Sequence, residues 1–216
     1  MKELDAVVFD MDGVIFDSER CVLECWKELA EKYGIRDMEK HFRECIGTNA
    51  VRTREIMTEA FGAAFSYDDF AKEASVSFHA KYDNGKLPLK PGIFQLLDHL
   101  KDNGKKIALA TSTRRASVLH QLEHAGLLDY FDTIITGDMV KRSKPDPEIY
   151  LLACEGIGVL PERAYAIEDS YNGVRSAHAG GLKVIMVPDL LPANDEMQAL
   201  AEIILKDLDQ VYGYLE

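Results

Sequence analysis

Several features common in other classes of protein are missing from this sequence. No apolar run approaches the roughly 18 residues that a membrane-spanning helix needs. The N-terminal MKELDAVVFD lacks the basic start, apolar run and small-residue cleavage site of a secretory signal. Cysteines are few and irregularly placed, unlike those of a disulfide scaffold: Cys21, Cys25, Cys45 and Cys154. We therefore expect a cytoplasmic protein with buried, reduced thiols and no membrane attachment.

Positive charge is also scarce. The chain has 25 lysines and arginines against 37 aspartates and glutamates, a formal net charge of −12. Nucleic acids and anionic membranes both reward clustered positive charge, so neither is expected as a partner. Of the 216 residues, 47% are hydrophobic, enough for the core of one domain or of a domain with an insertion. No repeat or low-complexity segment is visible. The sequence does not indicate an oligomeric state, and a monomer is our default expectation.

Short apolar runs alternate with helical patterns over most of the chain. Each run is bounded by turn or capping residues, as expected for strands buried on both faces. The patterns over Ile93–Asn103 and Ser117–Ala125 are each followed by a glycine, a helix-ending signal. The alternation predicts an α/β fold with a doubly wound parallel sheet. The predicted strands are Leu4–Phe9, Lys106–Ala110, Thr133–Thr136, Ala164–Ile167 and Lys183–Val187.

A helical block interrupts this alternation directly after the first predicted strand. Residues 17–86 contain helical patterns over Ser18–Tyr33, Val51–Phe61 and Tyr67–Tyr82, and Leu87–Gly92 resembles a linker. A loop after the first strand emerges at the carboxyl edge of the sheet. We therefore expect a core of residues 1–16 and 87–216 with a helical cap of residues 17–86 inserted over that edge.

Charged and polar residues follow four of the predicted strands. They are Asp10 and Asp12 after the first, Thr111 and Ser112 after the second, Lys144 beyond the third, and Glu168 and Asp169 at the fourth. The carboxyl ends of parallel strands face one crevice. Two carboxylates about 4 Å apart repel by about 4 kcal/mol at an effective dielectric of 20, so a cation or proton must offset them. Asp10, Asp169 and Glu168 suit Mg²⁺. A divalent cation, a lysine and a carboxylate nucleophile together favour phosphoryl transfer.

Taken singly, each of these residues has an ordinary structural explanation. Asp10 and Asp12 could be turn residues, and Thr111 and Ser112 could cap a helix. A lone lysine is commonly a solvated surface residue. The joint occurrence at successive strand ends, with complementary charges, favours a catalytic site.

The sequence resembles the haloacid dehalogenase-like phosphotransferase superfamily, within it the group of β-phosphoglucomutase and small sugar-phosphate phosphatases. The similar stretches span the chain, and the helical block corresponds to the cap of that family. They are VVFDMDGVIFDSE (Val7–Glu19), KIALATST (Lys106–Thr113), SKPDPEIY (Ser143–Tyr150) and IEDSYNGVRSAHAGG (Ile167–Gly181).

The resemblance implies a role for each residue of the site. Asp10 would be the nucleophile that forms an aspartyl-phosphate, and Asp12 the acid and base that serves the leaving group and then water. Mg²⁺ would be held by the Asp10 side chain, the Asp12 backbone carbonyl and Asp169, with Glu168 as a ligand or a support. The phosphoryl oxygens would be bound by Thr111, the Ser112 backbone and Lys144. The presence of Asp12 argues against the dehalogenase branch, which typically lacks this acid.

The cap departs from the β-phosphoglucomutase pattern at two positions. Val22 stands where that enzyme has a histidine, and Ala50 stands where it has a phosphate-binding arginine, with Arg52 nearby. Both departures favour a phosphatase of a small phosphorylated metabolite, such as a sugar phosphate, over a phosphomutase. A phospho-accepting receiver domain is a more remote alternative, because it is far shorter, has no helical insertion and carries its acceptor on a later strand.

The sequence leaves the cap side of the site open. Glu19 either faces the cap–core interface or is simply an acid favoured in the first turn of a helix. The residues that could contact the substrate from the cap are Val22, Trp26, Asn49, Arg52 and Lys81.

Overall fold

The core of the protein is a six-stranded parallel sheet. The structure, a computed structural model, describes residues 4–48, 50–62, 65–83 and 85–216. The strands are β1 (Ala6–Phe9), β2 (Lys106–Ala110), β3 (Thr133–Ile135), β4 (Ala164–Glu168), β5 (Lys183–Met186) and β6 (Ile203–Ile204). Their order is β3-β2-β1-β4-β5-β6, with β1 pairing in parallel with β2 on one side and β4 on the other. The order reverses beside β1, where an open α/β sheet forms its ligand crevice.

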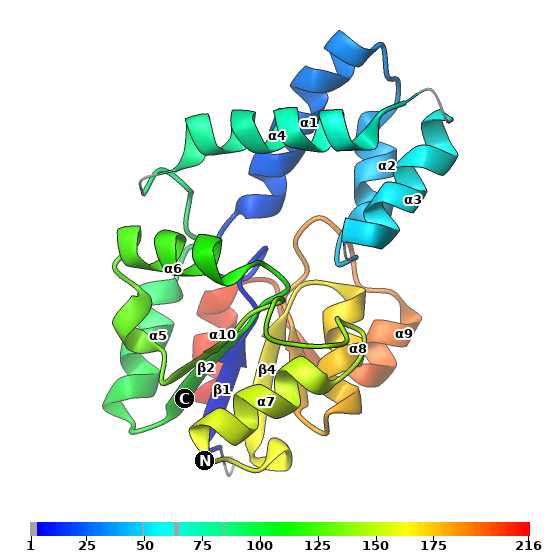
Figure 1. Ribbon diagram of the computed structural model, residues 1–216. Helices are drawn as coiled ribbons and strands as arrows, with labels where there is room; N and C mark the ends of the chain where they lie inside the picture. The colour runs from blue at the N-terminus through cyan, green and yellow to red at the C-terminus, as the bar shows by residue number, and fades with distance from the viewer. Residues whose placement is uncertain (1–3, 49, 63–64, 84) are drawn as a thin grey trace.

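Helices cover both faces of the sheet (Figure 1). One layer contains α5 (Ile93–Asp102), α6 (Arg115–His124) and α10 (Leu208–Leu215), and the other contains α7 (Glu148–Ile157), α8 (Tyr171–Ala179) and α9 (Asp195–Leu200). Successive residues of a strand point to opposite faces. In β1, Val7 and Phe9 therefore join the first layer, while Ala6 and Val8 join the second. This arrangement explains why the strand is an unbroken apolar run.

A separate group of helices lies over the carboxyl edge of the sheet (Figure 1). It consists of α1 (Ser18–Tyr33), α2 (Met38–Cys45), α3 (Ala50–Phe61) and α4 (Tyr67–Tyr82). These helices share a hydrophobic cluster of their own, in which the Trp26 ring meets Phe42 and Phe70 edge-on at 5.2 Å. Leu190 and Leu191, from the loop after β5, pack against this cluster and join it to the core.

The two connections between this helical group and the sheet run side by side. The Asp17 amide donates to Pro88 O at 2.9 Å, and the Lys90 amide donates to Ile15 O at 2.8 Å. The Lys90 ammonium lies 2.8 Å from both Asp17 and Asp189, so a cation ties the two connections to the loop after β5. Among the described residues, no helix is both long and apolar enough to cross a membrane.

The predicted elements agree closely with the structure. The fold class is confirmed, and Ser18–Tyr33, Tyr67–Tyr82 and Lys106–Ala110 have the predicted bounds. Several elements were given no predicted bounds, and α2, α9, β6 and α10 are examples. They are short, from two to eight residues, so hydrophobic periodicity has little length over which to appear.

Candidate active site

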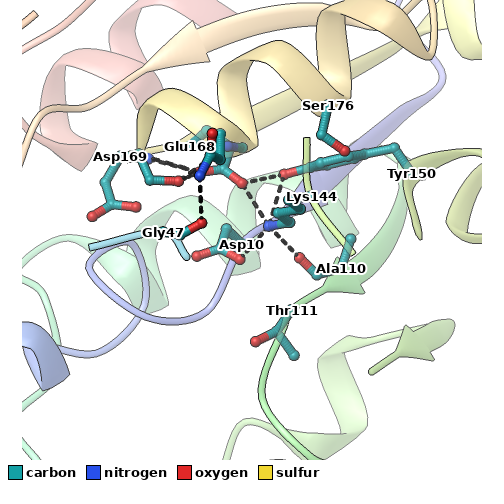
Figure 2. Close-up of polar contacts among 12 residues, drawn as sticks. Asp10, Gly47, Ala110, Thr111, Lys144, Tyr150, Glu168, Asp169 and Ser176 are labelled. Carbon is teal, nitrogen blue, oxygen red and sulfur yellow. Dashed lines mark hydrogen bonds and ion pairs between the residues drawn. The ribbon is translucent and has the colours of Figure 1, made fainter. Parts of the chain in front are cut away.

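A buried ammonium group lies at the centre of the site. Lys144 Nζ is 2.6 Å from Asp10 Oδ1 and 2.6 Å from Glu168 Oε1, and it donates to Ala110 O at 3.0 Å (Figure 2). Burial alone would lower the pKa of Lys144, but the two carboxylates outweigh it and raise that pKa above its ordinary value. The lysine therefore stays charged and offsets two acids inside the protein.

Glu168 is fully buried and holds other residues of the site in place through its hydrogen bonds. Its Oε1 also accepts a hydrogen bond of 2.6 Å from the Tyr150 hydroxyl. Its Oε2 accepts from the Asp169 amide at 3.1 Å and from the Ser170 amide and hydroxyl at 3.3 and 3.1 Å. A Cβ at Gly173 would lie 1.9 Å from the Glu168 carboxyl carbon, so only glycine leaves room for this carboxylate. With both oxygens engaged by the protein, Glu168 orients its neighbours.

Asp10 and Asp169 are the other two acids of a buried cluster. One carboxylate oxygen each from Asp10, Glu168 and Asp169 lies within 4.8 Å of the others, the one such group of possible metal ligands among the described residues. A Cβ at Gly13 would lie 2.1 Å from Asp169 Oδ2, so glycine there lets this carboxylate approach the loop after β1. Burial raises the pKa of both Asp10 and Asp169; neighbouring acids add to both rises, and Lys144 opposes the rise at Asp10. Buried oxygen donors that repel one another fit a hard divalent cation.

The Asp12 side chain is held by hydroxyl groups from two directions. Ser18 Oγ, at the start of α1, donates to Asp12 Oδ1 at 2.7 Å, and Thr113 Oγ1, after β2, donates to Oδ2 at 2.7 Å. The Thr111 hydroxyl makes a longer contact of 3.5 Å with Oδ2. Asp12 is therefore oriented by both the core and the first helix of the helical group.

These residues surround a cavity of about 610 Å³. All the residues expected to bind phosphate, Thr111, Ser112 and Lys144, line it. So do Asp10, Asp12 and Asp169, whereas Glu168 lies beneath its floor. The structure thus brings together side chains from the ends of β1, β2 and β4 and from the loop before α7.

The candidates on the cap side separate into two groups. Val22 lines the cavity, together with Glu19, Thr48, Ala50 and Val51. Three other candidates lie elsewhere: Trp26 is buried within the helical group, Arg52 pairs with Glu55 at 2.9 Å, and Lys81 pairs with Glu28. Asn49 lies outside the described residues.

Glu19 brings a further acid to the wall of the cavity. Burial raises its pKa to about 8, with Asp12, Asp189 and Asp10 adding to the rise and Lys90 opposing it. Glu19 lies in the first turn of α1 and also lines the cavity, so the structure agrees with both sequence-based interpretations.

Four polar residues that bind the acids of this site were not among the predicted site residues. Ser18 and Thr113 bind Asp12, and Tyr150 and Ser170 bind Glu168. Thr113 directly follows the predicted Thr111 and Ser112, so its place after a strand was an available signal. Tyr150 lies on α7, and its sequence position alone does not reveal this contact. The four cysteines are buried and unpaired, as expected.

Comparisons with known proteins agree with this geometry. A sequence model of the haloacid dehalogenase-like hydrolase family matches residues 7–187. A phosphorylated carbohydrates phosphatase of Thermotoga maritima is 37% identical over 182 residues, 84% of each chain. The crystal structure of CbbY from Rhodobacter sphaeroides in complex with phosphate is similar with a TM-score of 0.78 and 30% identity, covering 96% of each chain.

A β-phosphoglucomutase from Clostridium difficile is similar with a TM-score of 0.79 and 27% identity, covering 98% of this chain and 95% of that one. The family match extends from β1 to the end of β5 and so contains every residue of the cavity described above. The chain therefore belongs to the haloacid dehalogenase-like hydrolase family, and its relatives identify it as a phosphatase.

Proposed function

We propose that this protein is a Mg²⁺-dependent phosphatase that hydrolyses a small phosphorylated metabolite, a sugar phosphate, through an aspartyl-phosphate on Asp10. One observation carries the proposal: Asp10 and Asp12 face the same cavity, with Lys144 in contact with the first and two hydroxyl groups on the second. This pairing supplies a nucleophile and a separately oriented acid, which a two-step phosphoryl transfer requires.

In the first step, an oxygen of Asp10 attacks the phosphorus and the bond to the leaving oxygen breaks. Asp12 gives its proton to that oxygen, and the product alcohol leaves. In the second step, Asp12 takes a proton from water, the water oxygen attacks the phosphorus, and the Asp10 carboxylate is released with inorganic phosphate. Lys144 and Thr111 would bind the phosphoryl oxygens, with the Ser112 backbone. Mg²⁺ held by Asp10, Asp169 and the Asp12 carbonyl would supply positive charge to the transferring group.

The cap side of the cavity supports hydrolysis over a mutase reaction. A mutase must hold a bisphosphate, and its second phosphate needs a cation. Among the described residues of 17–86 that line the cavity there is no lysine or arginine, and apolar Val22 and Ala50 occupy the two positions that differ from β-phosphoglucomutase; the lysines of the cavity, Lys141 and Lys144, both belong to the core. The similarity to a phosphorylated carbohydrates phosphatase favours a sugar phosphate.

A panel of sugar monophosphates tests this proposal. We expect inorganic phosphate to be released over many turnovers with Mg²⁺ and not with EDTA. Conversion of a sugar 1-phosphate to its 6-phosphate, dependent on added bisphosphate, would instead support the mutase. Labelling of one phosphoryl group per chain without turnover would support the receiver domain.

A further inference from the structure

A chain of hydrogen bonds connects the core to the loop between α2 and α3. Asn172, in the first turn of α8, donates from Nδ2 to Gly47 O at 2.8 Å. The other end of the same amide, Oδ1, accepts from Arg175 Nη1 at 3.1 Å. Arg175 is held in turn by Glu196 on α9, with Nε 2.7 Å from Oε1 and Nη2 2.5 Å from Oε2. A guanidinium has no acceptor, so Arg175 fixes which end of the Asn172 amide faces Gly47.

The loop that receives this bond also contacts residues 168–170, the turn after β4 that carries Asp169 and is called the catalytic turn below. Gly47 has a φ of 69°, and a Cβ there would lie 3.1 Å from Ser170 Cβ and 3.2 Å from Ser170 Oγ. Ser170 donates to Glu168 and caps α8 by accepting from the Gly173 amide. Figure 2 shows the hydrogen bond that the Gly47 carbonyl accepts. The loop thus rests on the turn that carries Asp169.

The same loop leads into the cap wall of the cavity. Gly47 itself lines the cavity, as do Thr48, Ala50 and Val51 shortly after it in the chain. Other polar contacts join the helical group to the core, among them Arg43 with Leu190 O and Arg20 with Asp189, but neither of these arginines lines the cavity. The contact made by Asn172 is therefore placed to set the position of the cavity wall.

We propose that Asn172, oriented by Arg175, is a positioning residue that docks the α2–α3 loop onto the catalytic turn and so places the cap wall against the leaving group. The proposal rests on the proposed phosphatase function for its kinetic consequence. Its structural consequence, a docked loop, is independent of the reaction. Asn172 acts through Gly47 and need not touch the substrate.

Two substitutions separate the donor from the rest of the side chain. Asn172→Ala removes both hydrogen bonds. Asn172→Asp keeps an acceptor for Arg175 and suits the N-terminus of α8, but loses the donor to Gly47 O. Arg175→Ala leaves the amide in place without its orienting partner. Arg54→Ala is the matched control, because Arg54 pairs with Asp68 within the helical group at 2.5 Å, with both side chains largely exposed.

Hydrogen exchange over residues 45–53 and steady-state kinetics test the proposal together. We expect Asn172→Ala and Asn172→Asp to speed exchange in this segment about three- to ten-fold, the factor for one neutral hydrogen bond. In Asn172→Ala, kcat/KM for a sugar phosphate should fall by a similar factor, mainly through KM. With acetyl phosphate, whose leaving group is too small to reach the cap wall, kcat/KM should change less than two-fold. The exchange rate and kcat/KM of Arg175→Ala should lie between those of Asn172→Ala and those of the unsubstituted protein. Arg54→Ala should match the unsubstituted protein in both measurements.

Unchanged exchange over residues 45–53 in both Asn172 variants would overturn the proposal. So would an equal loss of kcat/KM for the sugar phosphate and for acetyl phosphate, since that indicates general damage to the site. If the unsubstituted protein releases no phosphate from any sugar phosphate, the proposed function fails, and the exchange experiment still decides whether Asn172 docks the loop.

Discussion

Lys144 Nζ lies 2.6 Å from Asp10 Oδ1 in the interior of the protein, and the same ammonium is 2.6 Å from Glu168. One cation thus serves both the expected nucleophile and the acid that supports the catalytic turn. Lys144 should therefore affect both the free energy of unfolding and the catalytic rate, and these two effects can be measured separately.

Replacing Lys144 with methionine should destabilise the fold. The substitution leaves the carboxylates of Asp10 and Glu168 buried without their cation, and breaking a buried ion pair in this way costs about 3–5 kcal/mol. The loss should shrink as the pH falls, because burial raises the pKa of Asp10 and protonation of that carboxyl group removes one of the two buried charges. Denaturant unfolding at several pH values measures both effects. A loss below 1 kcal/mol at neutral pH would contradict the described contacts, and Lys27→Met, on an exposed ion pair with Glu39, is the control.

Glu19 should make stability depend on pH in a defined direction. Its pKa is about 8 in the folded protein against an ordinary value of 4.5. Between these values the unfolded chain loses this proton first, so Glu19 favours unfolding increasingly as the pH rises, with the full effect above pH 8. Glu19→Gln should therefore raise the free energy of unfolding by about 1–3 kcal/mol above pH 8, less than the full pKa shift because the side chain lines an open cavity.

Little effect of the Glu19 substitution is expected below pH 4.5. Unfolding measured in EDTA from pH 4 to pH 9 provides the test. If Glu19→Gln raises the free energy of unfolding equally across this range, or most strongly in acid, then the surroundings of Glu19 do not raise its pKa.

Mg²⁺ should stabilise the protein through Asp10 and Asp169. A cation bound to the folded state alone stabilises it by about 2.7 kcal/mol at one hundred times its dissociation constant. Thermal unfolding with and without Mg²⁺ should show this shift, and Asp169→Asn should remove most of it. Asp209→Asn, at the start of α10, should leave it intact. An equal shift in the Asp169 variant would place the cation elsewhere.

Much of the site in the core could be predicted from the order in which strands and charged residues occur in the sequence. Asp10, Thr111 and Asp169 come directly after buried strands, and parallel strands must bring their carboxyl ends to one edge. The cap was less predictable. Its helices pack their apolar faces on one another. Trp26 is buried in that cluster, while Val22 on the same helix packs against the cluster and also lines the cavity.

Contacts between distant segments account for what the sequence could not provide. Nothing near Tyr150 in the sequence indicates that its hydroxyl reaches Glu168, because that bond depends on how α7 packs across the sheet, against β1, β2 and β3. The bond from Asn172 to Gly47 depends in the same way on how the helical group sits over the sheet. Local patterns determine elements, whereas such pairs arise only from the packing of those elements.

The most direct test of the account is the site at which the protein becomes phosphorylated. An Asp12→Asn variant lacks the base for hydrolysis, and acetyl phosphate has a leaving group that needs little help from an acid. Mixing the two with Mg²⁺, followed by acid quenching and peptide mass spectrometry, should show one phosphoryl group on Asp10, and none when Asp10→Asn is added. Phosphorylation of another residue, or sustained phosphate release by a protein carrying only Asp10→Asn, would contradict the account.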